Sequence, residues 1–369
     1  MGMSQAAGTG ANLLDLNPTE IEDLGMKLGW PRYRGSQVLK WLYQKGVTNI
    51  HEMTNLSKVD RERLQTVATI SRVPCSVPKI ASDGTAKFLG KLDDGLAVET
   101  VMIPEGHRRT VCVSSQVGCT LDCGFCLTAQ IGFRRNLSPR EIVDQVWNAR
   151  KMLEEKESIT SLVFMGMGEP LLNFESVAES IHRLTNVEWG MAIAPRRITV
   201  STAGWVPRFQ DLQRLGVNLA ISLNATTAHQ RQLLMPAVNK RFDLMQLIDA
   251  SRAYANRSDR RLTFEYVLIA KVNDSQEDAK RLVNLLKGIR CKINLIPFNE
   301  FSGSRYQRPS QDQIEAFQHT IRKSGLDVYL RRSRGDEVLG ACGQLGRMAS
   351  EAAHIIPQGL RRASVHAQS

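Results

Sequence analysis

From about residue 98 onward, the chain alternates short apolar runs with longer amphipathic segments. The apolar runs, which are rich in β-branched residues, lie at 111–113, 161–165, 198–201, 219–222, 264–269, 293–296 and 328–330. Continuous apolar runs are typical of parallel strands, because helices cover both faces of a parallel sheet. Their alternation with helix-length stretches predicts about six βα units. We therefore expect an α/β fold in which residues 98–350 form a partial (β/α)6 barrel, with ligand sites at the C-terminal ends of its strands.

The part of the chain before this barrel has a different pattern. Between residues 18 and 75 the apolar positions recur at helical spacing, which predicts a small helical accessory domain. Residues 76–97 contain two Asp-Gly pairs, which favour hairpin turns and a β-rich connector. The outermost residues at both ends are small and polar, so we assign 1–17 and 351–369 to flexible tails.

Two helix starts are marked by capping residues. Ser138, Pro139 and Glu141 provide an N-cap, a proline at the first helical position and a reciprocal acceptor at the third. Ser310 and Gln313 repeat the capping-box arrangement before the last long helix. We therefore expect helices to begin directly after Ser138 and Ser310.

The composition is that of a globular protein with an excess of basic residues. Hydrophobic residues make up 42% of the chain and charged residues 23%, which allows a well-buried core and excludes bulk disorder. The net charge of +11 would attract polyanions, although a merely basic soluble enzyme would show the same excess. The seven cysteines do not form the spread framework of a secreted disulfide protein. With no targeting sequence and no apolar run long enough to cross a bilayer, we expect a cytoplasmic protein without a membrane partner.

The sharpest chemical signal is a CxxxCxxC segment formed by Cys119, Cys123 and Cys126, in a loop after the first barrel strand. Three thiolates that lie so close together must share a soft cation. A closed zinc site is the alternative, but it needs a fourth ligand, and no second CxxC or paired histidine follows. A 4Fe-4S cluster with one iron left open fits three ligands directly.

This spacing, with an aromatic residue just before the last cysteine, resembles the radical S-adenosylmethionine superfamily. The resemblance implies that the open iron chelates the amino and carboxylate groups of S-adenosyl-L-methionine. It also implies that an electron from the cluster breaks the sulfonium bond and releases a deoxyadenosyl radical.

Further motifs extend the resemblance over nearly the whole chain. Within the superfamily, the chain resembles the RlmN/Cfr family of RNA adenine methyltransferases in the segments Val111 to Gln116, Gly132 to Leu137, Gly166 to Pro170, Ser201 to Gly204, Asn294 to Asn299 and Ala341 to Leu345. The helical domain, with Trp30, Arg32 and Trp41, is similar to the accessory domain of that family. The resemblance implies methylation at carbon 2 of an adenine in 23S ribosomal RNA and in tRNA.

The same resemblance assigns three catalytic roles. Carbon 2 of adenine is electron-poor and cannot attack a sulfonium methyl group, so radical addition is needed. In the family, a cysteine that matches Cys342 carries the methyl group as S-methylcysteine. Glu99 matches the family's proton acceptor. Cys112 matches the thiol that releases the product through a transient disulfide with Cys342.

The family also implies a set of residues that bind the cosubstrate. Gly168 and Glu169 follow one predicted strand, where glycine allows a close approach of the backbone and the carboxylate accepts from an amino group. The other positions that match are Ser201, Ser222, Leu223, Asn224 and Asn299. A histidine is commoner in the family where this chain has Asn224, and an amide can still donate and accept there.

The resemblance and the charge together indicate the partners. Ribosomal RNA and tRNA are the expected substrates, an electron donor such as flavodoxin reduces the cluster, and the chain acts as a monomer. Candidate RNA contacts are Trp30, Arg32, Tyr33, Arg34, Lys40, Trp41, Tyr43, Lys45, Arg134, Arg135, Arg331, Arg332 and Arg334. Two alternatives remain open, namely methylation at carbon 8 by the same machinery and a non-catalytic, metal-stapled RNA-binding protein.

Overall fold

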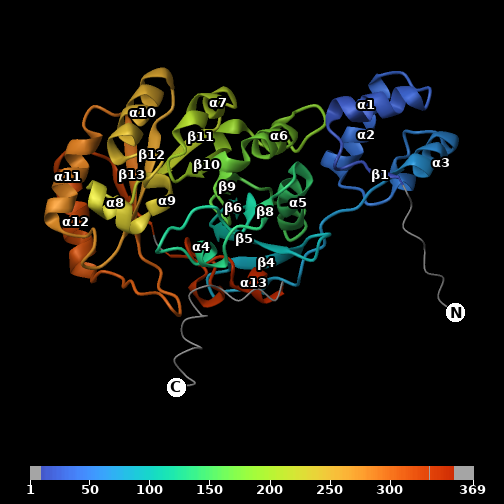
Figure 1. Cartoon of the computed structure of the whole chain (residues 1–369). Coiled ribbons are helices and arrows are strands. Elements are labelled where there is room, and N and C mark those ends of the chain that lie inside the picture. The colour runs from blue at the N-terminus through green and yellow to red at the C-terminus, as the bar shows by residue number, and fades with distance from the viewer. Residues whose placement is uncertain (1–9, 332, 353–369) are drawn as a thin grey trace.

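The computed structural model describes residues 10–331 and 333–352, and its centre is a ten-stranded sheet. Figure 1 shows this sheet running through the middle of the molecule. Its parallel part consists of β6 (Arg108–Cys112), β9 (Ser161–Phe164), β10 (Ile198–Thr202), β11 (Asn218–Ser222), β12 (Leu262–Leu268), β13 (Cys291–Pro297) and β14 (Val328–Leu330). These strands coincide with the apolar runs that the sequence predicts, so the α/β prediction is confirmed.

Helices follow most of these strands and pack along the sheet, from α5 in green to α12 in orange (Figure 1). They are α5 (Pro139–Arg150), α6 (Phe174–Thr185), α7 (Phe209–Arg214), α8 (Ala228–Leu234), α9 (Pro236–Asn239), α10 (Leu244–Arg257), α11 (Gln276–Leu286) and α12 (Gln311–Lys323). Short 3-10 helices are η3 (Pro170–Asn173), η4 (Pro195–Arg197), η5 (Val206–Arg208) and η6 (Asp336–Val338). In the described chain the sheet is open, with β14 and β3 at its two edges, as a partial barrel requires.

The two predicted helix starts have different outcomes. Ser138 and Glu141 form the full capping box at the start of α5. Ser310 accepts a hydrogen bond from the backbone of Gln313, but the Gln313 side chain donates to the carbonyl of Asp274 instead of closing the box. The reciprocal half of the second box was therefore a wrong prediction, because a tertiary contact competes for the same amide.

The predicted connector over residues 76–97 is part of the main sheet. Strands β3 (Lys79–Ile80), β4 (Ala86–Lys91) and β5 (Ala97–Glu105) extend the sheet in antiparallel order from β6. Gly84 and Gly95, with φ of 79° and 81°, lie in the two turns as the Asp-Gly pairs predict. A boundary at residue 97 was wrong, because β4 pairs along its whole length with β5.

The N-terminal region is a small helical domain. It contains α1 (Pro18–Lys27), α2 (Tyr33–Lys40), the π-helix η1 (Trp41–Lys45), the 3-10 helix η2 (Ile50–Glu52) and α3 (Lys58–Val67). Strand β1 (Ala11–Asn12) pairs in parallel with β2 (Ala68–Thr69), and Leu13 and Leu14 are buried directly after it. The flexible tail predicted over residues 1–17 is thus wrong from residue 10 onward, because these apolar side chains enter the core.

The remaining elements lie near the cysteine segment and the C-terminal end of the chain. They are β7 (Gln116–Val117), α4 (Leu127–Ile131), β8 (Arg135–Asn136) and α13 (Arg347–Ala352). The predicted C-terminal tail therefore starts later than residue 351, and the rest of it lies outside the described residues, as do residues 1–9. In the described chain, no helix is both long and apolar enough to span a membrane.

Candidate active site

The three motif cysteines face one cavity at the C-terminal ends of the parallel strands. Cys119, Cys123 and Cys126 lie in the loop between β7 and α4, and all three line a cavity of about 160 Å³ that we call the inner pocket. Backbone hydrogen bonds shape the loop, with Cys126 donating to the carbonyl of Cys123 over 3.1 Å and Gly124 donating to that of Leu234 over 3.0 Å. The loop therefore presents three thiols to a common space.

In the absence of a cation, the surroundings of this loop disfavour the thiolate forms of the three cysteines. Burial raises the pKa of all three thiols, and the neighbouring thiolates raise that of Cys123 further. A bound cation would stabilise the thiolate forms. Within residues 10–331 and 333–352, no three His, Cys, Asp or Glu side chains are arranged to hold a metal ion. Three thiols that line one cavity match the three ligands of a cluster with one open iron, whereas a closed zinc site would need a fourth ligand.

Glu169 is placed in the inner pocket by the turn that follows β9. Its carboxylate accepts hydrogen bonds from the backbone of Ala203 at 2.8 Å and of Leu171 at 3.2 Å. Burial raises the pKa of Glu169 to about 7 despite these bonds. Gly168 has a φ of 98°, and a Cβ there would meet Gln116 at 2.5 Å, so only glycine fits this turn.

The other predicted cosubstrate positions line the inner pocket with one exception. Ser201, Ser222 and Asn299 all face it, and the hydroxyl groups of the two serines lie 3.5 Å apart. Leu223 does not line the pocket, because its side chain is buried in the core. Because the side chain is buried, a contact from Leu223 to a ligand would have to come from the backbone. The backbone carbonyl already accepts a hydrogen bond from Arg231.

Asn224 is one of the predicted cosubstrate positions, and it has an unusual backbone conformation. Its φ of 54° lies in the left-handed region, which asparagine tolerates better than most residues. The side-chain oxygen accepts from the backbone of Val267 at 2.9 Å, and the amide nitrogen lies 3.5 Å from the sulfur of Met235. Asn224 therefore lines the pocket while its side chain bonds to the protein.

Glu265 is a pocket residue that the sequence analysis missed. It lies on β12 opposite Ser222 and is buried at the inner pocket. One carboxylate oxygen accepts from Asn294 at 2.9 Å, whereas the other has no hydrogen-bond partner. An unpartnered buried oxygen fits a ligand that brings hydroxyl or amino donors, as a nucleoside does. A glutamate inside an apolar strand was the signal that could have revealed it.

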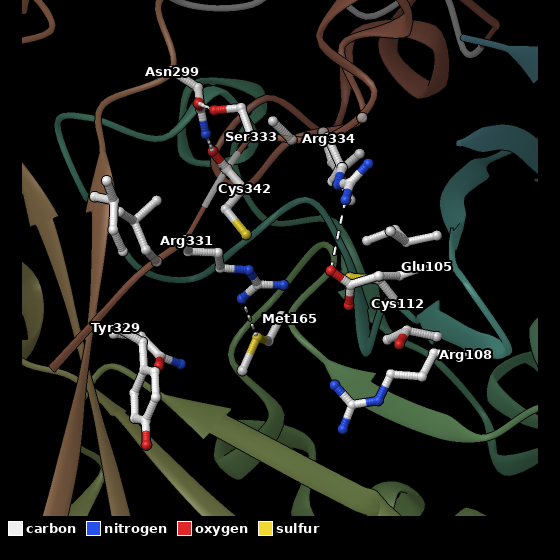
Figure 2. Close-up of a pocket in the computed structure, with 18 residues that line it drawn as sticks. Glu105, Arg108, Cys112, Met165, Asn299, Tyr329, Arg331, Ser333, Arg334 and Cys342 are labelled. Atoms are coloured by element: carbon white, nitrogen blue, oxygen red, sulfur yellow. Dashed lines mark hydrogen bonds and ion pairs between the residues drawn. The ribbon is translucent and has the colours of Figure 1, made fainter. Parts of the chain in front are cut away.

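A second, larger cavity of about 560 Å³ lies next to the inner pocket, and we call it the outer pocket. Figure 2 shows its lining, with Cys112 on the sheet and Cys342 on the loop that follows η6. The residues that line both pockets are Met165, Ile296, Asn299, Arg331 and Cys342. Cys342 therefore stands at the boundary between the two cavities, and its backbone carbonyl accepts from Asn299 at 3.2 Å.

Arg331 is the main charged group between the cavities. The Cys342 thiolate first, and then Glu265 and Cys112, hold the pKa of Arg331 above its usual range. Its guanidinium donates to the sulfur of Met165 at 3.7 Å (Figure 2). Burial raises the pKa of Cys112 to about 12, and Arg331 opposes that shift. Arg331 was a candidate for RNA contact, and the structure places it between the two thiols.

Glu99 lines neither pocket. It is fully buried on β5, and its carboxylate contacts the ammonium group of Lys87 at 3.0 Å and the backbone N–H of Ala349 at 3.1 Å. The register of the sheet pairs Val101 with Cys112, so Glu99 shares a sheet face with Cys112. Helix α13 packs against β5 and covers the carboxylate in this structure.

The candidate RNA contacts divide into exposed and buried groups. Tyr33 is exposed, whereas Tyr43 is buried and its hydroxyl accepts from Arg183, which removes Tyr43 from the set. Trp30 is buried as well and donates to Asp60. Arg135 forms ion pairs with acidic neighbours in its own domain. Arg332 lies outside the described residues.

Comparisons with known proteins agree with this geometry. Residues 11–70 match the family described as ribosomal RNA large subunit methyltransferase N-terminal domain, and residues 113–283 match the radical SAM superfamily. The dual-specificity RNA methyltransferase RlmN of Marinobacter nauticus is 44% identical over 344 residues, which cover 90% of this chain and 92% of the relative. The RlmN of Geobacter sulfurreducens is 45% identical, with 90% and 92% covered.

A solved structure supports the fold over the same span. The crystal structure of a radical SAM methyltransferase from Sphaerobacter thermophilus superimposes with a TM-score of 0.86 at 40% identity, covering 91% of this chain and 99% of that one. The likeness therefore extends through the accessory domain and the barrel together. With these identities and coverages, the chain belongs to the RlmN family of radical SAM RNA methyltransferases.

Proposed function

We propose that this protein methylates carbon 2 of an adenine in 23S ribosomal RNA and in tRNA, through an S-methylcysteine at Cys342. The observation that carries the proposal is the position of Cys342, which lines both the inner and the outer pocket. A thiol at such a boundary can receive a methyl group from one cavity and deliver it in the other. The relatives named above are dual-specificity RNA methyltransferases, which supports the two RNA substrates.

Cys119, Cys123 and Cys126 would hold a 4Fe-4S cluster, and the inner pocket would hold S-adenosyl-L-methionine. When bound, the reduced cluster would supply the electron that splits the cosubstrate to give a deoxyadenosyl radical, and would take one electron back after the methylene radical of Cys342 has added to the base. Glu169 accepts from the amino group of the cosubstrate, and Gly168 lets the backbone approach it. Ser201, Ser222, Leu223, Asn224 and Asn299 complete this binding set.

Cys342 acts first as an ordinary nucleophile. Its thiolate attacks the sulfonium methyl group of one cosubstrate molecule, a carbon–sulfur bond forms, and S-adenosylhomocysteine leaves. Arg331 lines the same boundary between the two pockets as Cys342 and places a positive charge there. Hydrogen abstraction from the S-methyl group then produces the carbon radical that adds to carbon 2 of adenine.

Glu99 and Cys112 complete the reaction. Glu99 takes the proton from carbon 2, and the electron pair of the broken C–H bond restores the aromatic ring. The Cys112 thiolate attacks the sulfur of Cys342, so that a disulfide forms and the carbon–sulfur bond breaks. The released electron pair stays on the exocyclic carbon, which takes a proton and becomes the methyl group. Both thiols are free in this structure, and a cellular dithiol would restore them after each turnover.

The partners follow from the same proposal. Ribosomal RNA and tRNA approach the outer pocket, where Arg108, Arg331 and Arg334 provide positive charge. We expect a flavodoxin-type electron donor, a monomeric protein and a cytoplasmic reaction.

Mass spectrometry of digested RNA tests the proposal. Reconstituted, reduced protein should produce 2-methyladenosine, and Cys342→Ala should produce none. Formation of 8-methyladenosine would show instead that the protein methylates carbon 8. RNA binding by a zinc-loaded protein without any methylation would support the non-catalytic alternative and contradict the proposal.

A further inference from the structure

Lys87 is a fully buried lysine beside the proposed proton acceptor. It lies on β4, where it pairs with Val101 of β5 and lies diagonally across from Glu99. Its ammonium group contacts the carboxylate of Glu99 at 3.0 Å, and the two side chains are 1% and 0% exposed. Buried lysines are rare, and this one forms an ion pair with a residue of the proposed mechanism.

The two carboxylate oxygens of Glu99 have partners of different kinds. One accepts from Lys87, which belongs to the central sheet, and the other accepts from the backbone of Ala349 in α13. The carboxylate can reach a base in the outer pocket only if the contact with α13 opens. The contact with Lys87 can persist during that opening, because all of β4 is paired with the part of β5 that carries Glu99.

Lys87 also contacts the segment that carries Cys342. Its ammonium group donates to the carbonyl of Leu339 at 3.1 Å, three residues before Cys342. Leu339 has a φ of 51°, an uncommon backbone conformation for leucine. One cation therefore touches both the proposed base and the loop of the methyl carrier.

We infer that Lys87 is a positioning residue that holds the carboxylate of Glu99 in place for removal of the carbon-2 proton, and that anchors the Cys342 loop beside it. This inference rests on the function proposed above. In the step concerned, the C–H bond at carbon 2 breaks, its electron pair stays in the ring, and the proton moves to an oxygen of Glu99. Without Lys87, the charge of this buried carboxylate would lose its ion-pair partner, and the side chain would lose the contact that orients it.

The other charges around this pair do not replace Lys87. Burial lowers the pKa of Lys87 and Glu99 opposes that effect, while Lys79 on β3 and Glu351 on α13 contribute smaller and opposite effects. Glu351 is itself paired with Arg347 at 3.0 Å. Lys87 is thus the cation in direct contact with Glu99 among the described residues.

The test separates methyl loading from proton removal. Full-length, reconstituted protein is first methylated on Cys342 and then reacted once with an RNA hairpin that contains the target adenine, at a series of pH values. The rates of adduct formation and of adduct release are measured separately for wild type, Lys87→Met, Lys87→Gln and Lys87→Arg. Lys91→Met is the matched control, because Lys91 lies on the same strand and is exposed.

Lys87→Met and Lys87→Gln should form the adduct and release it at least about tenfold more slowly than wild type at neutral pH, within the range that general bases contribute. Lys87→Arg should restore most of the rate, and Lys91→Met should match wild type.

Wild-type rates of adduct release in Lys87→Met or Lys87→Gln would overturn the inference. If Lys87→Met does not fold, Lys87→Gln and Lys87→Arg still decide, because a structural role predicts equal losses in both and a charge role predicts rescue by arginine alone. Absence of any adduct in wild type would overturn the proposed function instead, and with it the role of Lys87.

Discussion

Single side chains decide the chemistry of this site. Cys342 lines both cavities, and Arg331 lies between Cys342 and Cys112. A guanidinium remains charged at all physiological pH values, so it can stabilise either thiolate as the reaction alternates between them. The two cysteines thus share one source of positive charge.

Replacement of Cys112 should trap the reaction after the carbon bond has formed. Cys112→Ala removes the thiol that attacks Cys342 and leaves the other site residues in place, so a covalent protein–RNA adduct should accumulate. Denaturing gel electrophoresis with labelled RNA would detect it. Cys291→Ala is the matched control, since Cys291 is also buried on a strand but lines neither pocket. Normal turnover by Cys112→Ala would contradict the proposal that Cys112 releases the product.

Cosubstrate binding should depend on pH through Glu169. Its pKa is raised to about 7 by burial, so the carboxyl is protonated below that pH and cannot accept from the amino group. Affinity for S-adenosyl-L-methionine should fall by up to about tenfold per pH unit below pH 7. Titration calorimetry on reconstituted protein would measure this, and Glu169→Gln should lose that part of the dependence. An unchanged slope in the variant would show that another group controls it.

The raised pKa of Glu169 also makes the free energy of unfolding depend on pH. Between the ordinary pKa of 4.5 and about 7, the folded, unliganded protein holds a proton on Glu169 that the unfolded chain has lost. The contribution of this group to stability is therefore full below pH 4.5 and is lost as the pH rises through about 7. Glu169→Gln should have a flatter stability profile over that range.

At the scale of elements, the sheet supplies rigid positions and the loops supply the thiols. The cysteine loop and the Cys342 segment are joined directly, because the backbone of Leu127 donates to the carbonyl of Gly343 at 2.7 Å and the Thr128 hydroxyl donates to that of Leu345 at 2.6 Å. The proposed cluster ligands and the methyl carrier are thus linked through α4. This linkage explains how residues more than 200 positions apart in the chain share one site.

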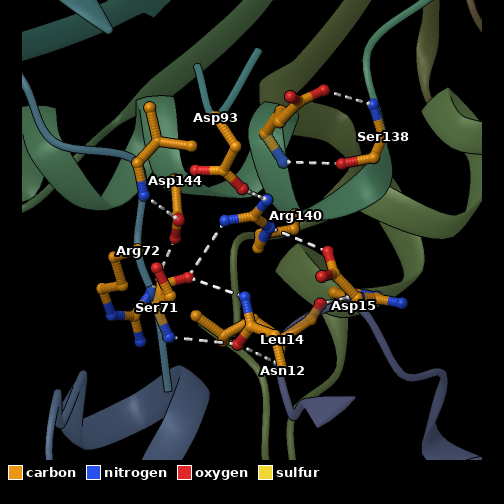
Figure 3. Close-up of polar contacts among 12 residues, drawn as sticks. Asn12, Leu14, Asp15, Ser71, Arg72, Asp93, Ser138, Arg140 and Asp144 are labelled. Carbon is orange, nitrogen blue, oxygen red and sulfur yellow. Dashed lines mark hydrogen bonds and ion pairs between the residues drawn. The ribbon is translucent and has the colours of Figure 1, made fainter. Parts of the chain in front are cut away.

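Helix α5 forms ion pairs with the accessory domain and with the β4–β5 turn of the main sheet, and the pair between Arg72 and Asp144 is buried (Figure 3). Asp144 accepts from Arg72 at 2.7 Å and from the backbone of Val73 at 2.8 Å, while Arg140 contacts Asp15 and Asp93. Breaking a buried pair leaves the remaining charge without a partner, which is much more costly than losing an exposed pair. These contacts therefore fix where the helical domain stands.

Asp144→Ala should destabilise the protein by about 3–5 kcal/mol, because Arg72 would keep its buried charge without this partner. Asp249→Ala is the control, since Asp249 and Arg252 form a surface pair that should contribute about 0–1 kcal/mol. Urea unfolding followed by circular dichroism would compare them. Equal midpoints for the two variants would contradict the proposed importance of this interface.

Element positions were easier to predict than contacts between distant elements. The apolar runs located the parallel strands, because burial on both faces leaves a local signature. A glutamate within an apolar strand could have drawn attention to Glu265. Its unpartnered oxygen and the buried pair of Lys87 and Glu99 depend on side chains from different strands, which no local pattern reveals. Burial of Leu13 and Leu14 was missed for a similar reason, since they follow β1, which pairs with the distant strand β2.

For the molecule as a whole, the two adjoining pockets separate the proposed cluster site from the proposed RNA site. The inner pocket lies beside the cysteine loop, and the outer pocket carries the basic residues that face a polyanion. The excess of basic residues along the chain adds a general attraction for RNA. The protein thus keeps the proposed radical source and the RNA on opposite sides of Cys342.

The central claim is that Cys119, Cys123 and Cys126 hold a cluster that opens S-adenosyl-L-methionine. The most direct measurement is the formation of 5′-deoxyadenosine by anaerobically reconstituted protein under reductant. Wild type and Cys75→Ala, whose cysteine is exposed and lines neither pocket, should produce it, and Cys123→Ala should not. Equal production by Cys123→Ala, or a wild-type protein that binds only zinc and cleaves no cosubstrate, would contradict the account.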